Sequence, residues 1–339
     1  MQPGSAGSSR NRSTAIRPRS RPEWYRGLES EKRVRSMVSG RWMIGWSEYT
    51  KSGKHNGRPI EETVGHLRKR PFRTCLKTCY FSGCTGDLPT MNYSEVLPAM
   101  PLQPYVECYW IRRGRPVAQA ARILPDGCTD ILYVFGSKAA VSDGALLVGT
   151  MTRAVLSSVA PEADVLGVRF RPGGLFPFVQ TPLHLFTDGL VELAGVQKQL
   201  GDSVFSALGD TDAWAVRIDR LDRALLKRLS AGQLPPPSVL ASVRHLEGQH
   251  GQFSIERLAD QGGISRRQLE RQFQQYVGVS PKLLARILRF RRMQALLRTQ
   301  PADSLMGLAF DNGYTDHAHL TKEFRAFAGI TPSTYWGEG

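Results

Sequence analysis

Polar side chains within residues 265–277 are spaced so that they could contact the edges of nucleic-acid bases. Leu269, Phe273 and Val277 recur at the spacing of one buried helical face. The opposite face would then carry guanidinium groups, which can pair with guanine O6 and N7, and a carboxylate, which can accept a hydrogen bond from cytosine N4. The residues predicted on or beside this face are Arg266, Arg267, Glu270, Arg271 and Gln274.

A second segment, residues 317–328, has the same layout with weaker base-reading chemistry. Leu320 and Phe324 are its predicted core positions. Ala318 offers only apolar contact to a thymine methyl group. We therefore expect the first segment to discriminate between sequences and the second to contact mainly phosphates. The residues predicted to face outward in the second segment are His317, Ala318, Thr321 and Lys322.

Both segments belong to a pattern that occurs twice. Five residues of the first copy recur 51 positions later, and the leading half of each copy matches at an offset of 50. Ser254 and Ser304 are candidate N-caps, while Gly263 and Gly313 permit the positive φ of a turn between two helices. Each copy therefore predicts a helix-turn-helix unit. The recurring pairs are Leu269/Leu320, Phe273/Phe324, Gly278/Gly329, Ser280/Thr331 and Pro281/Pro332.

The residues between the two copies predict one basic connecting helix. The candidate N-cap of the helix predicted within residues 265–277 is Ser265, and that of the helix predicted at residues 317–328 is Thr315 or Asp316. Residues 281–298 mix apolar side chains with arginines, which we expect to form structural ion pairs rather than DNA contacts. At ~1.5 Å per residue this helix is roughly 25 Å long. It suits two recognition helices about one DNA turn, ~34 Å, apart, so that one chain enters two successive major grooves.

Residues 238–336 resemble the DNA-binding domain of the AraC/XylS family of bacterial transcription regulators. The runs that carry the resemblance are SRRQLERQF at 265–273, GVSP at 278–281, GYTDHAHLTKEF at 313–324 and GITP at 329–332. The resemblance implies an all-α domain with two helix-turn-helix units. It also implies base contacts at Arg267, Glu270 and Arg271. Ala318 departs from the polar residue common at its position in that family.

Strand-like patterns dominate the preceding region, residues 91–234. Residues 121–124 and 131–135 are predicted strands joined by a Pro-Asp-Gly turn, and residues 164–170 form another, with Leu166, Val168 and Phe170 on one face. The runs LPDGCTD at 124–130 and GVRFRPGG at 167–174 resemble a sensor-like domain often found ahead of AraC-type DNA-binding domains, which implies a cupin-like barrel or sandwich. The predicted fold class is α+β multidomain, with a mostly β N-terminal domain and an all-α C-terminal domain.

An amphipathic helix is predicted at the end of this β-rich sensor or dimerisation domain. Trp214, Ile218, Leu221, Leu225 and Leu229 recur at helical spacing over about twenty residues. The helix either packs on its own β domain or forms a dimer contact, a role that such a helix often has in the resembled family. Three prolines at 235–237 predict a stiff linker and a domain boundary before 238–336.

The net charge of +15 is weak support for DNA binding because most of it lies outside the predicted DNA-binding domain. Residues 1–90 hold 18 lysines and arginines against 7 acidic residues, while residues 240–339 hold 13 against 9. The first 90 residues are rich in Arg, Ser and Gly, which is typical of a disordered basic tail. Alternatively, the true start is Met91 and the upstream stretch is an extension without function.

The residue patterns predict neither an enzyme nor a metal or cofactor site. His317 and His319 are two residues apart and do not share a helix face, and His184 is the only histidine between residues 91 and 232. Cys75 and Cys79 match half of the zinc-binding pattern of DNA-repair methyltransferases that carry an AraC-like domain, but no Cys-x2-Cys completes it. That enzyme, and an architectural DNA-binding module without ligand sensing, remain the alternatives to a regulator.

The remaining composition predicts a cytoplasmic protein without a membrane partner. No apolar run approaches the ~18 residues of a membrane span, and the N-terminus lacks an apolar signal core. Five unevenly spread cysteines fit reduced thiols. The expected partners are double-stranded operator DNA, a small-molecule effector, a second copy of the chain, and RNA polymerase if the protein activates transcription.

Overall fold

The computed structural model describes residues 92–114, 122–136, 143–157, 162–299 and 305–337. These residues all belong to one compact unit. The predictions of a basic leader at 1–90, of a start at Met91 and of a half-pattern at Cys75 and Cys79 lie outside the described residues, as does the candidate cap Ser304.

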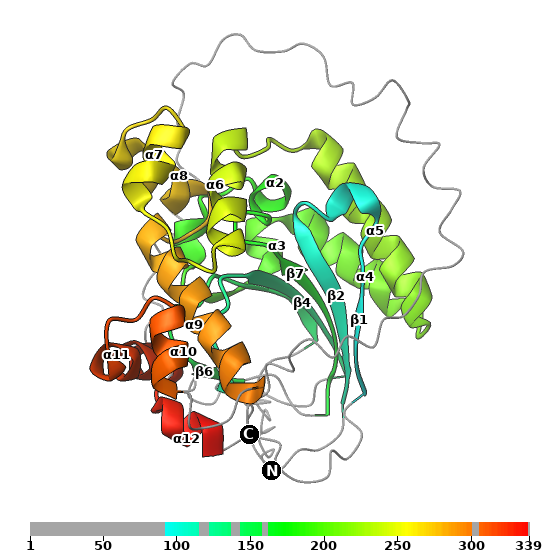
Figure 1. Cartoon of the computed structure of the whole chain (residues 1–339). Helices are drawn as coiled ribbons and strands as arrows, with labels where there is room; N and C mark the ends of the chain where they lie inside the picture. The colour runs from blue at the N-terminus through cyan, green and yellow to red at the C-terminus, as the bar shows by residue number, and fades with distance from the viewer. Residues whose placement is uncertain (1–91, 115–121, 137–142, 158–161, 300–304, 338–339) are drawn as a thin grey trace, which may run out of the picture. The chain divides into compact units, whose positions relative to one another are not determined.

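A six-stranded antiparallel sheet, in the order β1-β2-β7-β4-β5-β8, forms the framework of the N-terminal region (Figure 1). A separate two-stranded sheet pairs β3 with β6. The Pro-Asp-Gly turn therefore connects strands of two different sheets instead of closing a hairpin. The strands are β1 (Asn92–Val96), β2 (Val106–Arg113), β3 (Arg122–Ile123), β4 (Thr129–Phe135), β5 (Gly144–Val148), β6 (Val155–Leu156), β7 (Asp164–Phe170) and β8 (Leu190–Glu192).

One face of the large sheet holds the main core of this region. Leu166, Val168 and Phe170 lie together in that core, as their alternation predicts, and they pack with Tyr109 and Ile131 from the neighbouring strands. A layer of short helices covers this face. These helices are η3 (Met100–Leu102), α2 (Phe176–Val179), η4 (Leu183–Phe186), α3 (Leu193–Val196), η5 (Gln199–Ser203) and α4 (Val204–Gly209).

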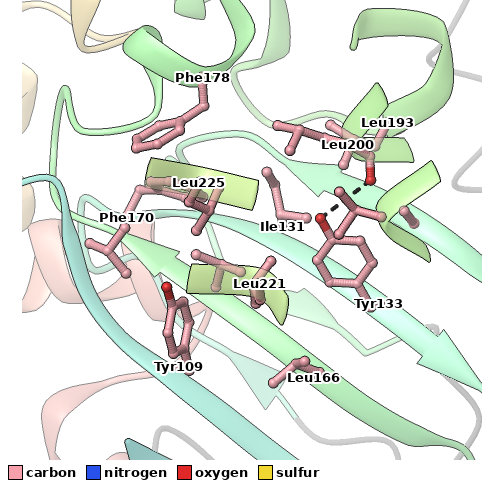
Figure 2. Packing of buried hydrophobic residues seen from close by; sticks show 14 of the residues in the cluster. Tyr109, Ile131, Tyr133, Leu166, Phe170, Phe178, Leu193, Leu200, Leu221 and Leu225 are labelled. Atoms are coloured by element: carbon pink, nitrogen blue, oxygen red, sulfur yellow. Dashed lines mark hydrogen bonds between the residues drawn. The ribbon is translucent and has the colours of Figure 1, made fainter. Parts of the chain in front are cut away.

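Helix α5 (Trp214–Ala231) packs its apolar stripe onto the same core. Leu221 and Leu225 lie against side chains of the sheet in Figure 2, and both are fully buried. The Tyr109 hydroxyl donates a 2.8 Å hydrogen bond to the buried Asp222 carboxylate, so the polar groups under the helix are paired. This packing agrees with the interpretation of α5 as part of its own β domain. A dimer contact through its outer face stays a prediction.

The C-terminal region is helical, and the prediction of a mostly β part followed by an all-α part is confirmed. Helix α9, predicted at 281–298, spans Pro281–Thr299 and supplies two faces to two cores. Leu284 and Leu288 join the first helix-turn-helix core, while Ile287 and Phe290 join the second. The other helices are α6 (Pro237–Gly248), α7 (Ile255–Gln261), α8 (Arg266–Tyr276), α10 (Leu305–Asp311), α11 (His317–Ala328) and α12 (Pro332–Gly337). The domain boundaries at 234 and 238 stay predictions.

None of the helices in the described ranges is both long enough and apolar enough to cross a membrane.

Candidate nucleic-acid interface

Side-chain caps and glycine turns build the two helix-turn-helix units. The Ser265 hydroxyl accepts from the Gln268 amide at 3.2 Å at the start of α8, and the Asp316 carboxylate accepts from the His319 amide at 2.7 Å at the start of α11. Asp316 is therefore the cap that the sequence left undecided. The predicted turn glycines have positive φ, +61° at Gly263 and +77° at Gly313.

The predicted reading face of α8 is exposed. Leu269 and Phe273 are buried on the opposite side, at 1% and 0% exposure, and they fix the rotation of the helix. The side chains that this rotation leaves exposed include all five predicted there: Arg266, Arg267, Glu270, Arg271 and Gln274.

The charges on this face are not equivalent. Arg266 pairs with Glu256 of α7 at 3.1 Å and with Glu270 at 3.4 Å, so its guanidinium is already engaged by carboxylates of both helices. Among the described residues, Arg267 and Arg271 form no salt bridge, and their guanidinium groups remain available for a ligand. Bidentate pairing with guanine needs such a free guanidinium.

Helix α11 presents a less charged face. His317, Ala318 and Lys322 are exposed, whereas Thr321 is half-buried and its hydroxyl lies 3.4 Å from His317 Nδ1. His319 turns back onto its own turn, where its Nδ1 lies 3.2 Å from the Thr315 hydroxyl. No group of three or more His, Cys, Asp or Glu suited to a metal occurs within the described ranges.

A buried carboxylate fastens α11 to the connecting helix. Glu323 is 5% exposed, and its Oε1 lies 2.6 Å from Arg286 Nε and 3.5 Å from Arg289 Nη2. Arg286 and Arg289 of α9 thus form the structural ion pairs expected of them. Sequence reasoning missed Glu323. Its position between Leu320 and Phe327 on the apolar face of α11 was the available signal, because a buried carboxylate needs a cationic or hydrogen-bonding partner.

The C-terminal ends of both recognition helices accept hydrogen bonds from the N-terminal region. The Thr187 hydroxyl donates to Gly278 O at 2.7 Å, just beyond α8. The Ala154 amide donates to Phe327 O at 2.7 Å, and Arg122 Nη1 donates to Ala328 O at 3.0 Å, at the end of α11. The Phe327 and Ala328 carbonyls belong to the last turn of α11, which lacks internal donors. No local sequence signal could have shown these contacts.

The two sequence runs that suggested a sensor-like domain meet in the structure. Arg169 of β7 lies between Asp126 and Asp130, at 3.8 and 3.6 Å, because β4 and β7 pair with Asp130 opposite Arg169. Burial raises the pKa of Asp130 to about 6, although Arg169 acts in the opposite direction. Nearby, Glu107 pairs with Arg291 of α9 at 3.3 Å and joins this charged cluster to the connecting helix.

Comparison with known proteins places a helix-turn-helix domain at the C-terminus. A family model described as a helix-turn-helix domain matches residues 258–337, and one described as a domain of unknown function matches residues 94–192. An uncharacterized HTH-type transcriptional regulator of Haemophilus influenzae is 34% identical over 97 residues, which are 28% of this chain and 32% of that protein. The HTH-type transcriptional regulator MtrA of Neisseria gonorrhoeae is 30% identical over 88 residues, or 26% of this chain and 29% of that protein.

The matched segment spans about a third of the length of these curated relatives. Among solved structures, an AraC-type DNA-binding-domain protein from Chromobacterium violaceum is 30% identical, with a TM-score of 0.28, and the match covers 30% of this chain and 91% of that one. The resemblance of the C-terminal region to AraC-type regulators is confirmed by the family model and the curated relatives, and residues 258–337 are a helix-turn-helix domain.

Proposed function

We propose that this chain is a transcription regulator that binds operator DNA sequence-specifically, with α8 and α11 in successive major grooves. The observation that carries the proposal is the pairing of two exposed helix faces on a helix-turn-helix domain related to those of transcription regulators. Both units are built on the single helix α9, whose 19 residues span about 28 Å. That length is close to the ~34 Å between successive major grooves.

Sequence discrimination belongs mainly to α8 in this proposal. Arg267 and Arg271 form no salt bridge within the described part of the chain, and each bidentate pair with guanine contributes about 1 to 3 kcal/mol of discrimination. Glu270 contacts Arg266 through one carboxylate oxygen at 3.4 Å, and its other oxygen can accept a hydrogen bond from a cytosine N4. On α11, Ala318 contributes an apolar contact, and Lys322 contributes a phosphate contact.

The N-terminal region is proposed to modulate this binding. Its contacts with the Gly278 carbonyl just beyond α8 and with the last carbonyls of α11 give a small-molecule effector or a second copy of the chain a physical route to both recognition helices. In this proposal the protein is cytoplasmic, is not an enzyme, and contacts RNA polymerase when it activates transcription.

The test is selection of bound genome fragments by the full chain, repeated with the double variant Arg267→Ala/Arg271→Ala. We expect wild type to select a motif whose two parts are one helical turn, about 10.5 base pairs, apart. The double variant should lose the part read by α8. A matched control, Arg223→Ala/Lys227→Ala, removes the same charge from exposed positions of α5 and should select the wild-type motif. Equal loss of binding to selected and random DNA in the α8 variant would reject the assignment of base reading to these arginines.

A further inference from the structure

A groove of about 810 Å³ separates the two helix-turn-helix units. Helix α9 contributes its floor through Lys282, Ala285, Arg286 and Arg289, while the start of α7 and one side of α11 contribute its walls. At one edge, Gln252 Nε2 donates a 2.9 Å hydrogen bond to Asp311 O and joins the two units directly. The buried Glu323 fastens α11 to the floor. The groove is therefore a fixed concavity of the domain.

The lining of the groove is cationic. Five arginine and lysine side chains face two carboxylates, those of Glu256 and Glu323. Arg286 and Arg289 are held by Glu323, and Arg266 is held by Glu256. Lys282 is exposed at the start of α9 and forms no salt bridge with any described residue, although its charge attracts the Glu256 carboxylate of the same groove. Its ammonium group can therefore bind an anion without first breaking a salt bridge.

The groove is continuous with both reading faces. Arg266 belongs to the groove and to the α8 face, and Lys322 belongs to the groove and to the α11 face. When two recognition helices occupy successive major grooves, the sugar–phosphate backbone between those grooves passes the protein surface that lies between the helices. The cationic groove is that surface.

The geometry points to this groove as a binding site for the sugar–phosphate backbone between the two reading sites, with Lys282 making a phosphate contact. The inference rests on the proposed function, because it needs both recognition helices on one duplex. A phosphate contact carries no sequence information, so the groove adds affinity equally on every sequence and fixes the position of the protein on the duplex. It is a separate contribution from base reading by Arg267 and Arg271.

The first test compares the salt dependence of DNA binding by wild type and by Lys282→Gln in the full chain. Each phosphate contact contributes about −0.9 to the slope of log K against log salt concentration. The slope of the variant should therefore be less negative by about 0.9. Between 50 and 200 mM salt, the factor by which its affinity falls should be about 3.5 times smaller than the factor for wild type. The loss should be the same on the selected operator and on random duplex. Lys227→Gln, a matched change on the exposed side of α5, should leave the slope unchanged.

A second variant is expected to bind DNA more tightly than wild type, and a folding defect cannot produce a gain in affinity. Glu256 is an exposed carboxylate of the groove, and Glu256→Gln both removes its repulsion of phosphate and takes away one of the two carboxylate partners of Arg266. This variant should bind both duplexes more tightly than wild type. Unchanged slope and affinity in Lys282→Gln, or no tightening in Glu256→Gln, would overturn the groove assignment. If wild type itself shows no preference for any sequence, the proposed function fails instead, and the two failures are therefore distinguishable.

Discussion

Removal of the Glu323 carboxylate should weaken the attachment of the second recognition helix more than any exposed charge change in the domain. Glu323→Gln keeps the size of the side chain but leaves Arg286 and Arg289 without the anion that both contact. The matched change is Glu256→Gln, which breaks an arginine–carboxylate pair of similar length, 3.1 Å against 2.6 Å. The two carboxylates differ in exposure, 6% for the Glu323 side chain and 64% for that of Glu256.

The expected magnitude follows from this burial. Loss of one partner from a buried ion pair costs about 3 to 5 kcal/mol. Here Arg286 retains 36% exposure and is partly hydrated after the change, and Arg289 retains its 3.1 Å hydrogen bond to Gly313 O. We therefore expect Glu323→Gln to lower the free energy of unfolding by the smaller amount of about 2 to 3 kcal/mol. At the exposed Glu256 site, water solvates the arginine that loses its carboxylate partner. The free energy of unfolding of Glu256→Gln should therefore equal that of wild type.

Urea denaturation of both variants and of wild type measures this difference directly. DNA footprinting adds a functional reading, because Glu323→Gln should lose protection of the half-site bound by α11 while retaining that bound by α8. The reasoning is refuted if Glu323→Gln and Glu256→Gln unfold at the same urea concentration with the same slope.

Three further predictions follow from contacts in the N-terminal region. Thr187→Val removes the donor to Gly278 O and should cost about 1 kcal/mol in thermal or urea unfolding, with Thr187→Ser as the control that retains the hydroxyl. Gly167→Ala would place a methyl group 2.0 Å from the Trp110 ring, and the overpacking should lower stability by about 1 to 3 kcal/mol, measured by thermal denaturation. Burial raises the pKa of Asp130 from 3.8 to about 6, so its folded form holds a proton more tightly than its unfolded form. Its contribution to stability is greatest below about pH 4 and falls by about 3 kcal/mol as the pH rises through 6. Asp130→Asn should abolish that fall in urea titrations at successive pH values, and an unchanged pH profile would contradict the assignment.

The sequence predicted the helical domain well because its signals there are local. A cap such as Ser265, a turn glycine such as Gly263 and the spacing of Leu269 and Phe273 all act within one or two helical turns. Their repetition in the second unit gave an independent check. These same signals determine which side of each recognition helix is exposed, so the predicted reading faces follow from them.

The pairing of strands was less predictable because it depends on contacts distant in sequence. The Pro-Asp-Gly turn suggested that its flanking strands belong together, but β3 pairs with β6, and β4 lies between β5 and β7. Nor does a local pattern show that Glu107 reaches Arg291. The partner of Glu323 could be anticipated only as a need for some cation, because burial of a carboxylate requires one without specifying which.

The hydrogen bonds at the ends of α8 and α11 also bear on the order in which the protein is made. A ribosome synthesises the chain from its N-terminus, and domains generally fold as units in that order. The donors Arg122, Ala154 and Thr187 are therefore synthesised before the last carbonyls of α11, including that of Ala328, which lies 206 residues after Arg122. Helices α8 and α11 are synthesised after the sheet that their ends contact, so under the proposed function an error in the sheet would change the spacing of the two helices on DNA.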